Sequence, residues 1–181
     1  MSAETPLRCR CGKTQLTVQG EPILSAECLC NSCRQAGLVL QSLANAPVVL
    51  NDYDATSFVL YRKDRVRYLS GVETLREHRL TPTRKTRRVI ATCCNTPMFL
   101  EFSQGHWLSL YSQLWPEQQR PSPKLRTMVS DLPDKGAALP KDIPNYRYQS
   151  VGFFFKLLTA WAAMGFRTPA MPAINGALDE R

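Results

Sequence analysis

Three cysteines within six residues constrain this chain more than any other feature of its sequence. Cys28, Cys30 and Cys33 form the pattern C-x-C-x-x-C. Both spacings let the backbone bend around one ion, and thiolates are ligands that Zn²⁺ binds well. Three protein ligands leave one tetrahedral position for water or substrate, whereas a structural zinc knuckle would add a distant cysteine. The stretch predicts a metal site, open or closed, with plain buried thiols as the alternative.

The other cysteines also favour metal binding over disulfides. A second tight pair, Cys9 and Cys11, precedes Gly12, and seven cysteines is an odd number. The members of the pairs Cys9/Cys11 and Cys28/Cys30 are too close in sequence for an easy mutual disulfide. We therefore expect reduced, metal-bound cysteines in a cytoplasmic protein, with one or two zinc ions per chain and no signal peptide.

Short alternating segments separated by turn residues predict a mainly β fold. No long amphipathic helix interrupts them, which favours an all-β core over 1–112. The expected strands are 14–18, 23–29, 37–43, 48–50, 58–61, 66–69, 74–80, 87–91, 98–102 and 107–111.

The last part of the chain has a different character and is expected to form an extension over 113–181. Six of the thirteen prolines fall between Pro116 and Pro144, which predicts an extended segment that wraps the surface or acts as a linker. An apolar run over 151–164, closed by Gly165, predicts one helix. It is shorter than the roughly 20 apolar residues of a membrane span. We expect it to pack on the core or, in a homodimer, on a second subunit; a membrane-surface helix is the alternative.

Most of the net charge of +8 comes from one stretch, 62–88, which contributes a formal +7. Tyr61 and Tyr68 are interleaved with its basic residues, as along a surface that binds a phosphate backbone. The sequence contains no recognisable nucleic-acid motif, and a solvated basic face explains the charge more simply. Binding of nucleic acid or another polyanion is therefore the weaker of these two hypotheses.

Three cysteine motifs in order resemble the glutathione-dependent formaldehyde-activating enzyme family, which also includes centromere protein V. The motifs are C-x-C-G at 9–12, C-x-C-x-x-C-R at 28–34 and C-[GN]-[ST]-P at 94–97. The resemblance runs over about 7–102 and implies a divergent member. It implies a β-tent fold, in which small twisted antiparallel sheets carry zinc sites.

The resemblance also implies two sets of zinc ligands. Cys28, Cys30 and Cys33 match the open, reactive site; Cys9, Cys11 and Cys94 match the structural site. The fourth structural ligand is missing at Ala91, where the family has cysteine, and Leu29 stands where the family commonly has histidine. Cys93 is the substitute that we expect, provided that the backbone turns beside Cys94; otherwise Cys93 is a buried thiol.

The implied chemistry is that of a carbon–sulfur lyase, the reversible addition of glutathione to formaldehyde to give S-hydroxymethylglutathione. A zinc with three thiolates would accept the glutathione thiol and activate it. Arg34 would hold a substrate carboxylate, or else form a surface ion pair. No general base is evident, since His78 and His106 are expected to be structural or exposed. The competing class is a non-catalytic zinc-stabilised module that binds a partner through the basic 62–88 surface or the C-terminal helix.

Overall fold

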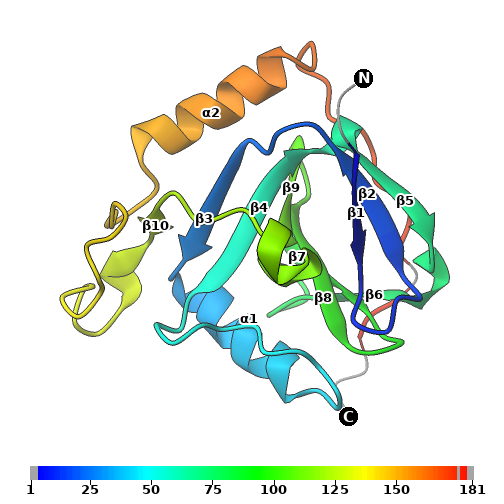
Figure 1. Ribbon diagram of the computed structural model, residues 1–181, viewed down its shortest axis with the longest axis horizontal. Helices are drawn as coiled ribbons and strands as arrows, with labels where there is room; N and C mark the ends of the chain where they lie inside the picture. Colours follow the sequence, from blue (N-terminus) through cyan, green and yellow to red (C-terminus); the bar gives the residue numbers. More distant parts are fainter. Residues whose placement is uncertain (1–3, 175, 179–181) are drawn as a thin grey trace.

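The predicted mainly β architecture is confirmed in a computed structural model, which describes residues 4–174 and 176–178 (Figure 1). The strands of this part are β1 (Glu4–Arg8), β2 (Gln15–Gln19), β3 (Leu24–Cys28), β4 (Thr56–Arg62), β5 (Val66–Ser70), β6 (Leu75–His78), β7 (Thr86–Ala91), β8 (Thr96–Phe102), β9 (Trp107–Tyr111) and β10 (Arg126–Thr127). The helices are α1 (Asn31–Ser42), α2 (Val151–Ala162) and the short 3₁₀ turns η1 (Lys63–Arg65), η2 (Val72–Thr74), η3 (Ser112–Leu114), η4 (Glu117–Gln119) and η5 (Val129–Asp131).

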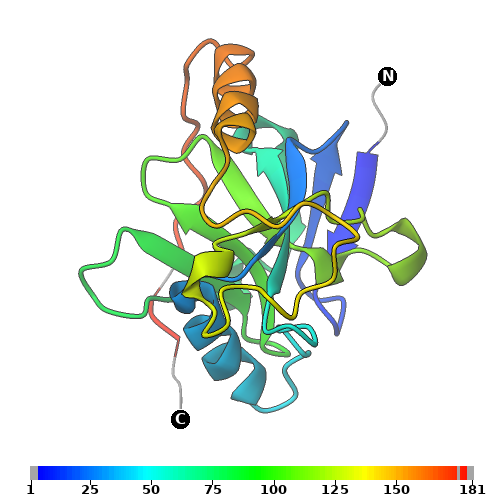
Figure 2. The same cartoon turned by 90° about the vertical axis from the view of Figure 1, so that its left-hand side faces the viewer.

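The strands form two sheets. The smaller has the order β1-β2-β5, and the larger has the order β10-β3-β4-β9-β8-β7-β6. All pairs are antiparallel except β10, which runs parallel to β3. Helices α1 and α2 lie at opposite ends of the molecule in both views (Figures 1 and 2).

The main core lies between the two sheets. Because successive side chains of a strand point to opposite faces, alternate residues of the large sheet enter this core and their neighbours face the other way. Tyr61 of β4 stacks on Trp115 at 6.1 Å between ring centroids. The buried core includes Leu7, Leu16, Val18 and Val66 of the small sheet and Val59, Tyr61, Val89, Phe99, Leu108 and Leu110 of the large sheet.

The strand predicted over 37–43 is wrong, because this segment is the second half of α1. The thiol of Cys30 caps the helix by accepting a hydrogen bond from the backbone N–H of Cys33. The buried residues of α1 are Cys33, Ala36, Gly37 and Leu40, which follow the helical spacing rather than an alternation of two. A Cβ on Gly37 would lie 2.4 Å from the Cδ2 atom of Leu50, so glycine permits the close packing of this helix.

Two smaller features of the N-terminal half also differ from the sequence prediction. Val48–Leu50 is a loop in which Leu50 alone forms an isolated bridge to Thr56. Strand β1, which pairs along its whole length with β2, was not predicted. Its residues alternate weakly and include Pro6, which an edge strand tolerates.

The extension is attached to the outer edge of β3. Arg126 of β10 is buried, and its Nε lies 2.7 Å from Glu27 Oε2 and its Nη1 lies 2.8 Å from Asp142 Oδ1. The backbone N–H of Glu27 also donates to the carbonyl oxygen of Leu125 at 3.0 Å. The division of the chain at 112 into a zinc domain and an extension stays a prediction.

Helix α2 matches the helix expected at the C-terminus and packs against the loop before β9. Ser150 caps it, accepting a hydrogen bond from the N–H of Phe153. A ring nitrogen of His106, Nε2, lies 2.9 Å from the carbonyl oxygen of Leu157, and the His106 ring stacks on Trp161. Burial lowers the pKa of His106, so the neutral imidazole is favoured in this contact. His106 thus fixes the position of α2.

Helix α2 also carries exposed apolar side chains, and one of them, Phe154, lies at the boundary between its packed and its exposed side. The side chains of Val151, Phe154, Phe155 and Leu158 are all more than half exposed. No helix of the described residues is long and apolar enough to cross a membrane. The homodimer expected through this helix stays a prediction.

Candidate metal centres and adjoining cavity

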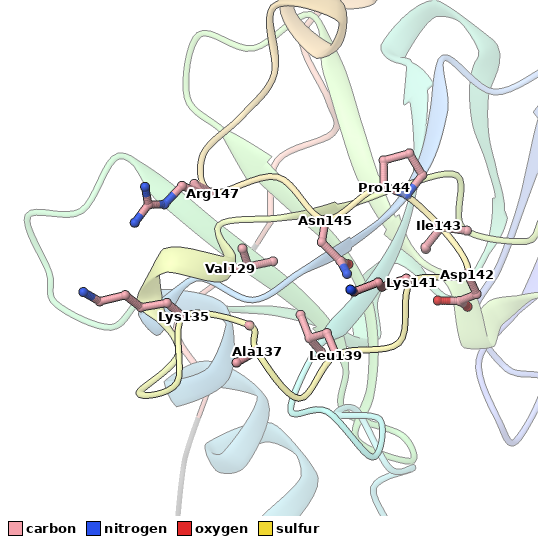
Figure 3. A pocket seen from close by; sticks show the side chains of 11 residues that line it. Val129, Lys135, Ala137, Leu139, Lys141, Asp142, Ile143, Pro144, Asn145 and Arg147 are labelled. Carbon is pink, nitrogen blue, oxygen red and sulfur yellow. The ribbon is translucent and has the colours of Figure 1, made fainter.

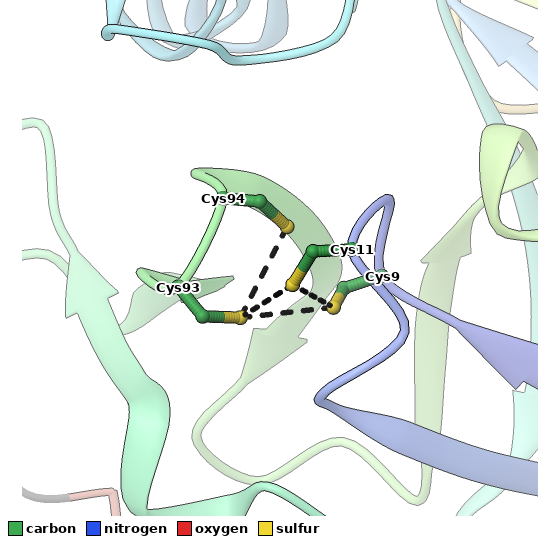
Figure 4. Close-up of side chains that lie close together, drawn as sticks. All are labelled: Cys9, Cys11, Cys93 and Cys94. Carbon is green, nitrogen blue, oxygen red and sulfur yellow. Dashed lines mark hydrogen bonds between the residues drawn. The ribbon is translucent and has the colours of Figure 1, made fainter.

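Four cysteines from two distant turns come together at one end of the sheets. The Sγ atom of Cys93 lies 3.7 Å from that of Cys9, 3.4 Å from that of Cys11 and 4.0 Å from that of Cys94 (Figure 4). Four thiolates around a tetrahedral zinc, with Zn–S bonds of about 2.3 Å, would have sulfur atoms about 3.8 Å apart. The donor set and its spacing therefore fit a closed zinc site.

The turn between β7 and β8 lets adjacent cysteines face one point. Residues 92–95 form this turn, and Asn95 has a left-handed backbone with φ of 50°. Burial raises the pKa of Cys93 to about 12, so without a metal its thiol is protonated at neutral pH. Ala91 precedes the turn on β7, and its side chain is fully buried. The backbone therefore turns beside Cys94, as the substitution of Cys93 for the missing ligand requires. The role of Cys93 as fourth ligand stays a prediction.

The second group, Cys28, Cys30 and Cys33, forms where β3 leads into α1. Their three sulfur atoms lie within 4.8 Å of one another, and the described residues add no fourth His, Cys, Asp or Glu ligand to this group. Cys28 ends β3, Cys30 caps α1 and Cys33 lies in its first turn. The N-terminus of a helix favours negative charge, so this position stabilises thiolates.

Without a bound metal, the three thiols differ in how readily they ionise. Hydrogen bonds from Cys28 and then Cys33 lower the pKa of Cys30 to about 3. The same hydrogen bonds to Cys30 raise the pKa of Cys28 well above its ordinary value. The group therefore holds one thiolate readily, and a metal ion would be needed to deprotonate all three.

Arg88 of β7 is a residue of this site that the sequence prediction missed. Its side chain is 2% exposed, and its Nη2 donates to the Ser32 carbonyl oxygen at 2.9 Å and lies 4.0 Å from Cys33 Sγ. No carboxylate of the described residues forms an ion pair with it. A buried cation costs several kcal/mol unless it is compensated. Three thiolates on Zn²⁺ carry a net formal charge of −1, and Arg88 is placed to balance it.

Replacing Arg88 with methionine is expected to weaken zinc binding at Cys28, Cys30 and Cys33 about 10- to 100-fold, the usual effect of losing a residue that supports metal ligands. Arg88→Lys should retain most of the affinity, because it keeps the charge. Arg67→Met removes the same charge from an exposed position and serves as control. Competition with a fluorescent zinc chelator measures the affinity; equal affinities for all four proteins would contradict this role.

Arg34 forms an ion pair outside the cysteine group. Its Nη2 lies 3.3 Å from Asp54 Oδ2, in an ion pair whose carboxylate side chain is 59% exposed. The Arg34 side chain does not line the cavity described below. This arrangement matches the surface ion pair, while substrate binding by Arg34 stays a prediction.

A cavity of about 430 Å³ opens beside Cys28, Cys30 and Cys33, which form part of its wall. Its floor is the face of the large sheet that points away from the main core, and the N-terminal half of α2 covers it. The described part of the chain supplies two charged side chains to the lining, Arg84 and Arg88. The apolar lining residues are Ala26, Phe58, Leu60, Leu100, Phe102, Trp107, Met128, Phe153, Phe154 and Leu157.

A larger hollow of about 810 Å³ lies elsewhere, in the loop of the extension between Val129 and Arg147 (Figure 3). All its lining residues come from this one segment, and no cysteine is among them. It is a shallow space within a loop, and its lining residues Val129 and Leu139 pack in one cluster with Leu29, which lies between Cys28 and Cys30.

Part of the basic stretch 62–88 forms ion pairs within the fold. Lys63 and Arg87 pair with Glu101, which is buried. Arg62 pairs with Asp64, and Arg79 and Arg87 both contact Glu77. These contacts and the burial of Arg88 involve five of the ten basic side chains of the stretch. Its formal charge of +7 already counts Asp64 and Glu77, so Glu101 alone offsets it further, and binding of a polyanion stays a prediction.

Comparison with known proteins supports the resemblance drawn from the cysteine motifs. Residues 5–47 match the family described as glutathione-dependent formaldehyde-activating enzyme. This segment holds Cys9, Cys11 and the group of Cys28, Cys30 and Cys33. A crystal structure of a Rhodobacter sphaeroides protein aligns with 68% of this chain and all of its own, at 17% identity and a TM-score of 0.44. No curated protein matches the chain.

Proposed function

From the match of residues 5–47 to the formaldehyde-activating family, we propose that this chain forms carbon–sulfur bonds between a thiol, such as glutathione, and formaldehyde or a related small electrophile. The observation that carries the proposal is the geometry of Cys28, Cys30 and Cys33. The described residues supply three sulfur ligands and no fourth, and the group faces a cavity. Zinc bound there would keep one position for substrate.

The cysteine group suits a zinc ion because its donor set is soft and its sulfur atoms converge. A bound zinc would supply a Lewis-acidic coordination position for the substrate thiol and would lower the pKa of that thiol. The protein itself would contribute charge stabilisation and the exclusion of water. Arg88 and the N-terminus of α1 stabilise the negative charge of the sulfurs, and the apolar cavity wall keeps water from the reacting carbon.

The reaction balances without an oxidant. The thiol sulfur bonds to the carbonyl carbon, the carbon–oxygen π bond opens, and the proton lost by the thiol ends on the new hydroxyl oxygen. His78 and His106 belong to neither cysteine group among the described residues. Proton transfer is therefore assigned to solvent at the mouth of the cavity rather than to a histidine.

The test is to load the protein with zinc and measure the zinc content and the sulfur coordination number by X-ray absorption, with and without glutathione. We expect two zinc ions per chain and a higher average number of sulfur ligands when glutathione is added. S-methylglutathione, which lacks a thiol, should cause no change. NMR exchange between formaldehyde and S-hydroxymethylglutathione should be faster with the protein than without it. An unchanged coordination sphere and an unchanged exchange rate would overturn the proposal.

The exposed face of α2 favours a second candidate, a non-catalytic module that binds a protein partner. Four exposed apolar side chains on successive turns of one helix are unusual on a surface that binds no partner. They are those of Val151, Phe154, Phe155 and Leu158. In this case both cysteine groups would hold zinc for stability alone. The coordination experiment separates the two functions, because a purely structural zinc would not gain a ligand from glutathione.

A further inference from the structure

We infer that the cavity beside Cys28, Cys30 and Cys33 selects an aldehyde that carries an apolar group of about the size of an aromatic ring, rather than formaldehyde itself. The inference rests on the proposed function, which it makes more specific. It concerns the residues that line the cavity, and the three cysteines matter only because they mark the place where the reaction would occur.

The floor of the cavity is a regular sheet surface. Five strands each contribute a pair of lining residues two positions apart, so that each pair lies on the same face. Leu60, Ser109, Leu100 and Arg88 are consecutive partners across β4, β9, β8 and β7. The pairs are Ala26 and Cys28, Phe58 and Leu60, Thr86 and Arg88, Leu100 and Phe102, and Trp107 and Ser109.

Helix α2 forms the roof through Phe153 and Leu157, and Phe154, which is 57% exposed, lies at the edge of the cavity. Leu157 is 6% exposed, and its carbonyl oxygen is held by His106. The roof is therefore anchored to the loop that leads into β9 of the floor. An apolar group in this space would contact aromatic rings from both sides, from Phe58 and Trp107 below and from Phe153 above.

The volume of the cavity is too large for formaldehyde. At about 430 Å³ it falls within the range of roughly 300–1,000 Å³ that is usual for small-molecule sites. Formaldehyde has two heavy atoms and could contact only a small part of the wall. In a hydrophobic pocket, one methylene group changes kcat/KM roughly 10- to 200-fold. A substrate with a larger apolar group would therefore be strongly favoured.

The distribution of charged side chains indicates where each of the two substrates would lie in the cavity. Arg84 is exposed and stands at the mouth, where it can meet a carboxylate of glutathione. No Asp or Glu of the described residues lines the cavity, so a positively charged substituent would find no partner there. The thiol compound would thus remain at the polar rim, and the aldehyde's neutral apolar group would enter.

The addition is the same as in the proposed function, with the sulfur bonded to the aldehyde carbon and the proton transferred to its oxygen. The product is a hemithioacetal that carries the apolar group. No further reactant is needed.

The experiment compares phenylacetaldehyde with formaldehyde, each with glutathione and zinc-loaded protein, and uses 2-phenylethanol as an unreactive binding probe. Phe153→Ala should lower the ratio of kcat/KM values, phenylacetaldehyde over formaldehyde, about tenfold. Phe155→Ala is the matched control, because Phe155 lies on the same helix but is 64% exposed and outside the cavity. Ser109→Leu narrows the cavity from the sheet side and provides an independent variant.

The outcomes separate the inference from the proposed function. Turnover of formaldehyde with no turnover of phenylacetaldehyde, and no binding of 2-phenylethanol by NMR, would overturn the inference and leave the function standing. Binding of 2-phenylethanol that Phe153→Ala weakens, with no turnover of either aldehyde, would support the cavity and overturn the function. Equal ratios in all variants would also overturn the inference.

Discussion

Replacing Cys93 with serine is expected to lower the zinc content of the protein by one ion per chain and its free energy of unfolding by at least about 3 kcal/mol. Structural zinc sites contribute much of the folding energy of small metal-binding domains. Cys93 is the cysteine whose sulfur lies 3.4 to 4.0 Å from the other three, so its loss removes a neighbouring sulfur from each of them. Zinc analysis and urea unfolding would measure the two effects.

The double variant Ala91→Cys/Cys93→Ser provides the control. It returns a cysteine to the position where the family resemblance expects one, and it should recover at least part of the zinc content. Undiminished zinc in Cys93→Ser alone would show that Cys93 is a buried thiol and that the first site uses other ligands.

Replacing Cys30 with serine is expected to remove the second zinc and to slow the thiol addition about 30-fold or more at pH 7. A free thiol with a pKa near 8.5 is only a few per cent ionised at this pH, whereas a metal-bound thiol is fully ionised. The helix should survive, because serine is a favoured N-cap residue and can replace the Cys30 thiol in that role. Zinc content and NMR exchange rates measure the loss.

Asn31→Ala is the matched control for this variant. Asn31 lies in the same turn, its side chain is exposed, and it belongs to neither cysteine group. It should keep both zinc ions and the wild-type rate. If Cys30→Ser also kept both zinc ions and the wild-type rate, the site at the start of α1 would not be the reactive centre.

The sequence predicted the parts of the fold that depend on local alternation. Most strands, the C-terminal helix and the turn at Cys94 follow from patterns within a few residues. Helix α1 was missed because the run Gly37–Leu43 reads as a strand when the cap at Cys30 is ignored. Its buried positions become clear only when Cys33 and Ala36 are included in the period.

The sequence predicted the cysteines of the candidate site but neither Arg88 nor the cavity. Its cysteines are marked by close spacing, but Arg88 is one of ten basic residues in a charged stretch and nothing local distinguishes it. Its role arises from strand register, which brings β7 beside the start of α1. The cavity also depends on long-range packing, since the roof residues of α2 are more than a hundred positions away in sequence from the cysteines of its wall.

The four-cysteine group has a consequence for how the chain reaches its native state. A zinc ion held by Cys9 and Cys93 would tie together residues 84 positions apart. A permanent tie across a loop of this length removes about 4.5 kcal/mol of chain entropy from the unfolded state. The ion would join the first hairpin of the small sheet to a late hairpin of the large one. Metal supply during synthesis would then decide how quickly the two halves of the protein find each other.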